Sequence, residues 1–220
     1  MKPIVIFGIG ELAEVAAFYF EHDSPRVVAA FTVDAGYLRE STFSGLPVVP
    51  FEELADTLPP SAYDLFVAVG YSGLNDLRAS KCAAGRSAGY ALAMYVSSRA
   101  TTWPGLVTGD NAFILEDNTI QPFARIGNNV VLWSGNHVGH HAVIEDNVFV
   151  TSQVVISGGV TIGENTFLGV NSTIRDHVRI GRRCVIGAGA VITEDAEDGS
   201  VYIPAPSSKS RVPSSRLRHL

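Results

Sequence analysis

Cysteine and long apolar runs are both scarce in this chain, and each scarcity excludes a class of protein. The only cysteines among the 220 residues are Cys82 and Cys184, which lie far apart without a metal-type spacing. Neither a disulfide framework nor a zinc knuckle is expected, and a reducing compartment fits. No apolar run approaches the length of a membrane-spanning helix, and residues 1–7 are too short for a signal-peptide core. We expect a cytoplasmic protein with no membrane partner.

Positive charge is also in deficit. The chain has 16 Lys and Arg against 22 Asp and Glu, a formal net charge of -6. Such a surface has no general attraction for nucleic acid, so no nucleic-acid partner is expected. Residues 207–220 are locally basic and are expected to form a solvated C-terminal tail. With 46% hydrophobic residues, the rest of the chain is able to bury a real core in one large or two small domains.

The first half of the chain alternates short apolar runs with helical stretches. Strands are predicted at 4–7, 27–33, 65–69 and 91–96, and helices at 11–22 and 74–88. Strands that alternate with helices indicate a small parallel sheet of the doubly wound kind. We therefore expect a Rossmann-like α/β domain over residues 1–96.

A six-residue repeat governs the second half. Fourteen aliphatic residues follow one another at this spacing: Ile114, Ile120, Ile126, Leu132, Val138, Ile144, Val150, Ile156, Ile162, Leu168, Ile174, Ile180, Ile186 and Ile192. Neither the strand period nor the helix period produces such a series. A triangular parallel β-helix does, because each hexapeptide forms one flat side and points its aliphatic residue into the prism. Four to five coils are expected after an irregular lead-in over 97–112.

Two further positions of the repeat support this architecture. Glycine often follows the aliphatic residue, at positions 127, 139, 163, 169, 181 and 187. We expect these glycines to turn the corners of the prism. Small or β-branched residues recur four places after the aliphatic one: Ala124, Ala142, Val148, Val160, Thr166, Ser172 and Ala190. They are expected to fill the remaining interior corner.

A glycine motif opens the chain. Gly8, Gly10 and Ala13 fit G-x-G-x-x-G/A between the first strand and the first helix. The backbone amides from Gly8 and Gly10 to Glu11 are expected to face phosphate or polar sugar groups. Asp34, at the end of the second strand, is expected either to bind a ribose hydroxyl or a base edge, or to be an ordinary polar strand end.

Two more polar residues follow the third predicted strand of this region. Asn75 and Arg78 are candidates for contact with the bound group. For Arg78 the alternative is a solvated face of the helix over 74–88.

The sequence resembles a known family in several segments. They are Gly8-Ile9-Gly10, Val69-Gly70-Tyr71 with Asn75 and Arg78, Asn136-His137-Val138-Gly139-His140-His141, and Gly187-Ala188-Gly189-Ala190. Through them the chain is similar to the left-handed β-helix acyltransferases of the hexapeptide-repeat superfamily. More narrowly, it resembles bacterial sialic acid O-acetyltransferases and the N-acetyltransferases of nucleotide-linked 4-amino-4,6-dideoxysugars. The resemblance covers nearly the whole chain and implies a left-handed parallel β-helix over residues 97–206.

The resemblance also implies a function. In that family the β-helix binds acetyl-CoA between neighbouring subunits of a homotrimer, and the N-terminal domain holds the nucleotide of the sugar. The expected activity is therefore N-acetylation of the amino group of a nucleotide-linked amino-deoxysugar, for the synthesis of surface glycans such as lipopolysaccharide. Acetyl-CoA is the expected co-substrate, and no metal is expected.

Histidine supplies the candidate base. Acyl transfer from a thioester needs a base for the proton of the incoming amine or hydroxyl and an N–H donor for the developing oxyanion. His137, His140 and His141 crowd into one turn of the repeat, and histidine titrates in the right range. Matching the family pattern puts His140 on the catalytic base, ahead of its two neighbours. Family members often place a carboxylate directly after this histidine, whereas here the next residue is another histidine, which leaves Glu145 or Asp146 as candidates to orient the base.

The same matching gives the cofactor contacts. Gly158 falls where a backbone N–H meets the thioester carbonyl, and Val170, Ala188 and Gly189 fall along the pantetheine track. The alternative for these glycines is a purely structural role in the turns of the β-helix.

Three other functions stay open at this stage. An O-acyltransferase acting on a sugar hydroxyl needs the same base and oxyanion donor. A zinc hydratase of the γ-carbonic-anhydrase type also uses histidines on a left-handed β-helix, although its ligand spacing does not match this cluster. A structural β-helix protein without catalysis is the third alternative.

Overall fold

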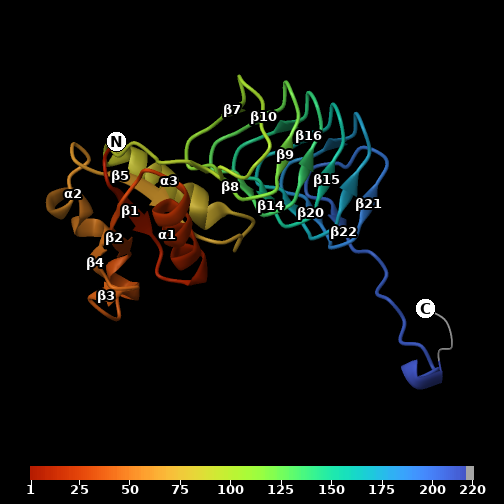
Figure 1. Ribbon diagram of the computed structural model, residues 1–220, viewed down its shortest axis with the longest axis horizontal. Helices are drawn as coiled ribbons and strands as arrows, with labels where there is room; N and C mark the ends of the chain where they lie inside the picture. Colours follow the sequence, from red (N-terminus) through yellow and green to blue (C-terminus); the bar gives the residue numbers. More distant parts are fainter. Residues whose placement is uncertain (217–220) are drawn as a thin grey trace.

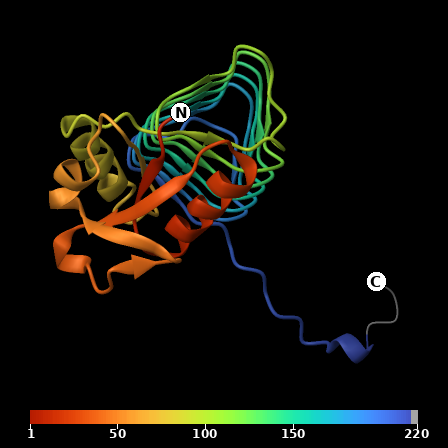
Figure 2. The same ribbon diagram turned by 60° about the vertical axis from the view of Figure 1, so that its left-hand side comes forward.

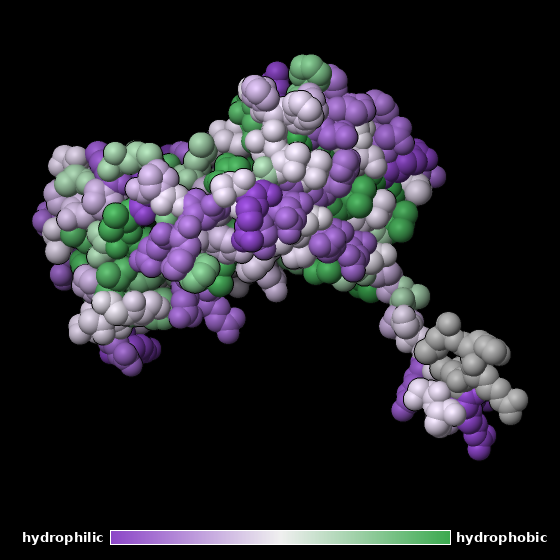
Figure 3. Space-filling view, viewed as in Figure 1, coloured by the Kyte–Doolittle hydropathy of each residue, from purple (hydrophilic) through white to green (hydrophobic). Residues whose placement is uncertain are grey.

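The computed structural model describes residues 1–216 and confirms the predicted fold class. An α/β region comes first, and the stacked coils of a left-handed β-helix follow it along the long axis of the molecule (Figure 1). Residues 205–216 are exposed and lead away from the last coil (Figures 1 and 3). No helix within residues 1–216 is both long and apolar enough to cross a membrane.

The N-terminal region is a five-stranded sheet in the order β3-β4-β2-β1-β5. Its strands are β1 (Ile4–Phe7), β2 (Val28–Val33), β3 (Thr42–Phe43), β4 (Leu46–Pro50) and β5 (Asp64–Val67), with only β3 antiparallel to its neighbour. The helices are α1 (Glu11–Asp23), α2 (Leu54–Thr57) and α3 (Asp76–Ser87), with short 3-10 turns η1 (Ala35–Tyr37) and η2 (Phe51–Glu53). The predicted elements are confirmed except at 91–96. Strand β4 was not predicted, because two of its five residues are proline. Proline is found in strands mainly near a sheet edge.

The β-helix has three flat sides. Side 1 contains β6 (Tyr95–Val96), β8 (Phe113–Ile114), β11 (Val131–Leu132), β14 (Phe149–Val150), β17 (Phe167–Leu168), β20 (Val185–Ile186) and β22 (Val201–Tyr202). Side 2 contains β9 (Thr119–Ile120), β12 (His137–Val138), β15 (Val155–Ile156), β18 (Thr173–Ile174) and β21 (Val191–Ile192). Side 3 contains β7 (Val107–Thr108), β10 (Arg125–Ile126), β13 (Val143–Ile144), β16 (Thr161–Ile162) and β19 (Arg179–Ile180). The turn η3 (Ser214–Arg216) lies in the tail.

The strand predicted at 91–96 was wrong as a single element of the first region. Leu92 forms only an isolated bridge with Leu65 of β5, whereas Tyr95 and Val96 pair with β8 and open side 1 of the β-helix. An apolar run alone does not say which of two adjacent sheets a strand joins.

The six-residue repeat forms the core of the prism. Each of the fourteen aliphatic residues is the second residue of a strand, points inward and is at most 3% exposed. The small residues four places later, such as Ala142 and Val160, are buried in the same cluster. Full burial of one such aliphatic side chain stabilises the fold by about 1.5–3 kcal/mol relative to exposure.

The corners of the prism differ from the prediction. The residue in the left-handed conformation comes three places after the aliphatic residue and is often Asn, as at Asn129 and Asn147, or His, as at His141. The glycines directly after the aliphatic residue have ordinary φ angles. They are required by the spacing of the coils, since a Cβ on Gly139 would lie 2.5 Å from the backbone N of Gly158 in the next coil.

The N-terminal region packs against side 1. The outward residue of successive strands on this side is apolar or aromatic, namely Phe113, Val131, Phe149 and Phe167. These residues join one core cluster with Phe20 and other residues of α1 and the N-terminal sheet. Figure 2 shows the N-terminal region lying beside the coils, and the shared cluster joins the two regions through a continuous apolar interface.

Asp23, at the end of α1, adds a polar link between the two regions. Its carboxylate accepts hydrogen bonds from Tyr95 Oη at 2.5 Å, from Ser97 Oγ and Ser98 N at 2.9 Å, and from Ser98 Oγ. These donors, Ser98 foremost, hold the pKa of Asp23 well below its ordinary value of 3.8.

We expect Asp23→Asn to destabilise the protein at neutral pH and this destabilisation to shrink as the solution becomes acidic. Because the folded-state pKa is depressed, the carboxylate stabilises the fold above the unfolded-state pKa, and this contribution fades as the pH falls below about 4. Thermal unfolding of both proteins from neutral pH to about pH 3 measures the difference. Glu21→Gln, an exposed change on the same helix, is the control, and a difference independent of pH would contradict the assignment.

Candidate active site

A cavity of about 660 Å³ lies at the carboxyl ends of β1, β2 and β5. Gly8, Gly10 and Glu11 line it after β1, Asp34 after β2 and Gly70 after β5. In open parallel sheets, the crevice beyond the carboxyl ends of the strands is the usual ligand site. Four of the predicted substrate contacts thus lie on one cavity.

The glycine motif has a physical basis in this cavity. Gly8 has a φ of +129°, and a Cβ on it would lie 2.7 Å from Ala68 O and 3.3 Å from the Ala13 side chain. Only glycine lets β1 turn into α1 while the helix packs so closely on the strand. The N–H groups of Glu11 and Leu12 have no acceptor within residues 1–216. They are free to bind an anion at the helix N-terminus.

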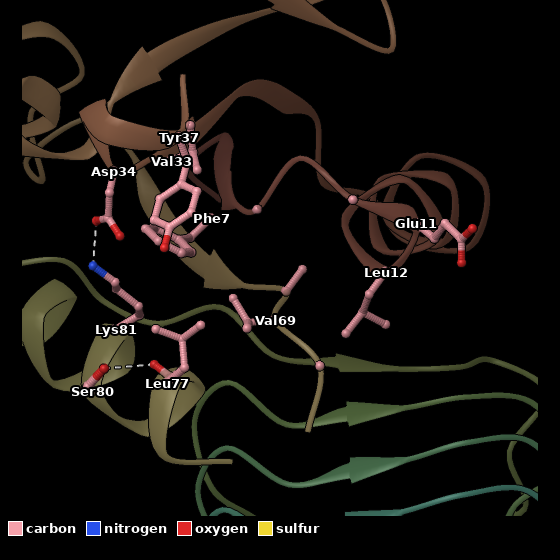
Figure 4. A pocket seen from close by; sticks show the side chains of 14 residues that line it. Phe7, Glu11, Leu12, Val33, Asp34, Tyr37, Val69, Leu77, Ser80 and Lys81 are labelled. Carbon is pink, nitrogen blue, oxygen red and sulfur yellow. Dashed lines mark hydrogen bonds and ion pairs between the residues drawn. The ribbon is translucent and has the colours of Figure 1, made fainter. Parts of the chain in front are cut away.

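Polar groups stand at both ends of the cavity (Figure 4). Asp34 pairs with Lys81 of α3, and Tyr37 lies beside this pair. Glu11 lies at the other end, beside Leu12. Lys81 was missed by the sequence analysis, because a lysine on an amphipathic helix carries no sign of the strand end it faces. Its Nζ also lies 5.1 Å from the centroid of the Phe7 ring, a cation–π contact.

Asn75 and Arg78 do not line this cavity. Both are fully buried, so the solvated helix face considered for Arg78 is wrong. The Arg78 guanidinium donates to Asn129 Oδ1 at 2.9 Å, Asn129 O at 3.0 Å and Asn75 Oδ1 at 3.0 Å. Its charged group therefore ties α3 to a corner of the β-helix. The burial lowers the pKa of Arg78 to about 10.

The candidate base lies in the corner between sides 2 and 3, which we call the histidine corner (residues 139–142 and 157–160). His140 and His141 are both exposed there, and their Nδ1 atoms are 3.2 Å apart. His140 N donates to Gln121 Oε1 at 2.9 Å, and its carbonyl accepts from Gly159 N at 2.8 Å. The backbone of His140 is thus fixed by the coils above and below it.

Gly158 lies directly beneath the His140 ring. A Cβ on Gly158 would be 2.7 Å from both Nε2 and Cε1 of His140. The N–H of Gly158 has no acceptor within residues 1–216. The predicted base and the predicted oxyanion donor therefore stand side by side, with the donor free.

Three other candidates for this region lie apart from the base. His137 is half-buried on β12, and no hydrogen bond in the described chain joins it to His140 or His141. Glu145 accepts from Glu164 N, and Asp146 accepts from Asn128 N at 2.7 Å and from Asn128 Nδ2. The two carboxylates are thus engaged elsewhere, and the partner of His140 in the structure is His141.

The predicted pantetheine contacts occupy a different corner. Val170, Ala188 and Gly189 are exposed in the corner between sides 1 and 2, where Gly189 N donates to Val170 O at 2.8 Å. Side 2 separates them from His140 and Gly158. One chain therefore does not bring all of the predicted acyl-transfer residues together.

The N-terminal cavity is also remote from the base within one chain. The region that contains the cavity packs on side 1, and the histidine corner is the one corner that does not border side 1. The chain's own His140 thus lies at the corner opposite the side on which the N-terminal region packs.

A metal ion would need several side chains in the described part of the chain that could hold it together. Within residues 1–216, no three His, Cys, Asp or Glu side chains converge in a geometry suited to a metal ion. His140 and His141 contact each other, and within the described chain no third such side chain joins them.

The family model for the bacterial transferase hexapeptide (six repeats) matches residues 123–158 and 159–194. None of the curated proteins matches the chain significantly. Among solved structures, perosamine N-acetyltransferase from Caulobacter crescentus, a variant in complex with CoA and GDP-perosamine, superimposes with a TM-score of 0.84. It is 26% identical, over 94% of this chain and 96% of that chain.

Two further solved structures share the fold. The acetyltransferase domain of PglB from Neisseria gonorrhoeae has a TM-score of 0.80 at 23% identity, over 91% of this chain and 96% of that chain. WeeI from Acinetobacter baumannii has a TM-score of 0.69 at 19% identity, over 91% and 96%. The α/β region and the β-helix therefore occur together in the same arrangement in several proteins.

Proposed function

We propose that this chain, which matches the hexapeptide transferase model over residues 123–194, acetylates the amino group of a nucleotide-linked amino-deoxysugar, such as a 4-amino-4,6-dideoxyhexose. Acetyl-CoA is the acetyl donor, and the acetylated sugar is used in the assembly of surface glycans. The observation that carries the proposal is that the same chain has both a cavity with free backbone amides and, on a separate face, an exposed histidine beside the free N–H of Gly158. The relative that binds CoA and GDP-perosamine, alike over nearly the full length of both chains, supports the same substrate class.

The two regions divide the work in this proposal. Residues 1–96 bind the nucleotide, with the free amides of Glu11 and Leu12 toward its phosphates. Asp34 and Lys81, at the other end of the cavity, suit polar groups of the ribose or base, because a carboxylate accepts and an ammonium donates hydrogen bonds. Residues 97–206 carry the acyl transfer.

His140 and Gly158 perform the chemistry. The sugar amine attacks the thioester carbonyl carbon while His140 Nε2 takes a proton from the amine nitrogen. The carbonyl oxygen becomes an oxyanion that accepts a hydrogen bond from the Gly158 N–H. When the C–S bond breaks, the CoA thiolate leaves and takes the proton from His140, so the enzyme returns to its starting state.

A homotrimer with sites between subunits is part of the proposal. Within one chain, the cavity, the corner with Val170 and Ala188, and the histidine corner face different directions. A neighbouring subunit that brings its histidine corner to these elements completes the site. Sedimentation equilibrium is expected to give three times the chain mass of 23.5 kDa.

Thiol release from acetyl-CoA, measured with UDP-, dTDP- and GDP-linked 4-amino-4,6-dideoxysugars, tests the function. We expect turnover with one of them, and a fall in kcat of about a hundredfold or more for His140→Ala, because general-base catalysis contributes at least that factor. His22→Ala, at an exposed histidine on α1, is the matched control and is expected to leave kcat unchanged. The assignment fails if no such sugar releases thiol, and product analysis separates an amide from the ester of an O-acyltransferase.

A further inference from the structure

The pair of histidines at the histidine corner has a defined geometry. Nδ1 of His140 and Nδ1 of His141 are 3.2 Å apart, and the ring planes meet at 84°. Two neutral imidazoles form a hydrogen bond through these atoms only when one Nδ1 carries a proton and the other does not. The contact therefore couples the tautomers of the two residues.

His141 is held in place independently of His140. Its backbone has a φ of +59°, and its N–H donates to Pro122 O at 3.3 Å. Its ring packs against Phe123, with the ring centroids 4.8 Å apart. A ring anchored in this way is able to orient its neighbour.

We propose that His141 is the positioning residue of this site, and that its Nδ1 accepts a hydrogen bond from Nδ1–H of His140. This bond fixes the tautomer in which Nε2 of His140 is unprotonated, and Nε2 is the ring nitrogen nearest to Gly158. The proposal rests on the proposed function, which makes His140 the base.

The left-handed backbone at position 141 offers a matched pair of variants. His141→Gly removes the side chain without backbone strain, because glycine adopts positive φ freely. His141→Asn also tolerates this conformation, and its Oδ1 stands the same number of bonds from Cα as Nδ1 of histidine. Both variants lose the contact with Phe123, so they differ chiefly in the hydrogen-bond acceptor.

We expect kcat to fall by roughly ten- to a hundredfold in His141→Gly, with KM values within about twofold of the wild type, since a misdirected base loses part of its contribution. His141→Asn is expected to restore kcat to within about threefold of the wild type, because the acceptor is back in place. Equal kcat values for the two variants, whether high or low, would overturn the proposal.

A second readout does not depend on activity. In protein labelled with ¹⁵N-histidine, long-range ¹H–¹⁵N spectra distinguish the two neutral tautomers, and His140→Ala identifies the His140 signals. We expect the Nδ1–H tautomer for His140 in the wild type and its loss in His141→Gly. An Nε2–H tautomer in the wild type would refute the role of His141, even if no substrate had been found. Absence of turnover with every sugar, together with the expected tautomer, would refute the proposed function alone.

Discussion

Gly158→Ala is expected to lower kcat by at least about a thousandfold while the protein stays folded, because it displaces the base and obstructs the oxyanion donor at once. The added methyl would lie 2.7 Å from His140 Nε2, closer than any such contact allows. The His140 ring is exposed and is able to swing away at little cost in stability. It then no longer points at the reacting amine, and the methyl occupies the approach to the free Gly158 N–H.

Thiol release, measured in single-turnover and steady-state experiments, gives the change in rate. Thermal unfolding of the same preparations gives the change in stability. We expect kcat to fall sharply and the thermal midpoint to change little. Gly36→Ala is the matched control, because Gly36 is exposed, has an ordinary φ and has nothing within 4 Å of an added Cβ. If Gly158→Ala turns over at the wild-type rate, the catalytic roles assigned to His140 and Gly158 are both wrong.

The repeat made most of the β-helix predictable. Its inward residues follow one spacing, so the inward orientation of a single position, such as Ile144, is predictable without knowledge of the rest of the fold. The conformation of the corners was harder to predict. The left-handed residue is Asn129 in one coil and His141 in another, so no single residue type marks it. Glycine was predicted to turn the corners because the close contacts of these glycines with the next coil are invisible in the sequence.

The side that the N-terminal region covers was also encoded but not recognised. Outward positions of side 1 carry Phe113, Val131, Phe149 and Phe167 at a spacing of one coil, whereas those of side 3 include Arg125 and Arg179. Outward aromatic residues on one side of a β-helix indicate a covered face, because an exposed apolar stripe of this length is costly. A count at the coil spacing, in addition to the hexapeptide spacing, detects this signal.

Some residues of the candidate site were predictable from the sequence, and others were not. Gly8, Gly10 and His140 stand in local motifs whose context is readable along the chain. Lys81 and Gln121 act through partners that are distant in sequence, Asp34 and His140, so their roles depend on the tertiary structure. For Arg78 a polar residue after a strand suggested a ligand contact, but only the packing reveals that its partners belong to the β-helix.

Arg78→Met is expected to reduce the free energy of unfolding by about 3–5 kcal/mol, because it removes several charge-assisted hydrogen bonds and deprives each of their buried acceptors of a donor. Asn129 loses the Arg78 donors to its Oδ1 and to its carbonyl oxygen, and the Oδ1 keeps only its bond from Asn111 Nδ2. Asn129 also accepts from Asn111 Nδ2, and Asn111 in turn bonds the backbone of Val67 on β5. The loss therefore weakens the whole polar seam between the N-terminal sheet and the β-helix.

Thermal unfolding at a fixed protein concentration measures this loss, and we expect the midpoint to fall by about 10 °C, given the size of the chain. Arg183→Ala is the control, since Arg183 forms an exposed ion pair with Asp76 of the same helix α3 and is expected to shift the midpoint little. An unchanged midpoint with a raised KM for the nucleotide-sugar would contradict this prediction. It would indicate that Arg78 contacts the substrate. The expected pattern is the reverse, a lowered midpoint with KM preserved at temperatures where the variant is folded, because the guanidinium lies outside the cavity and donates to protein oxygens of the described chain.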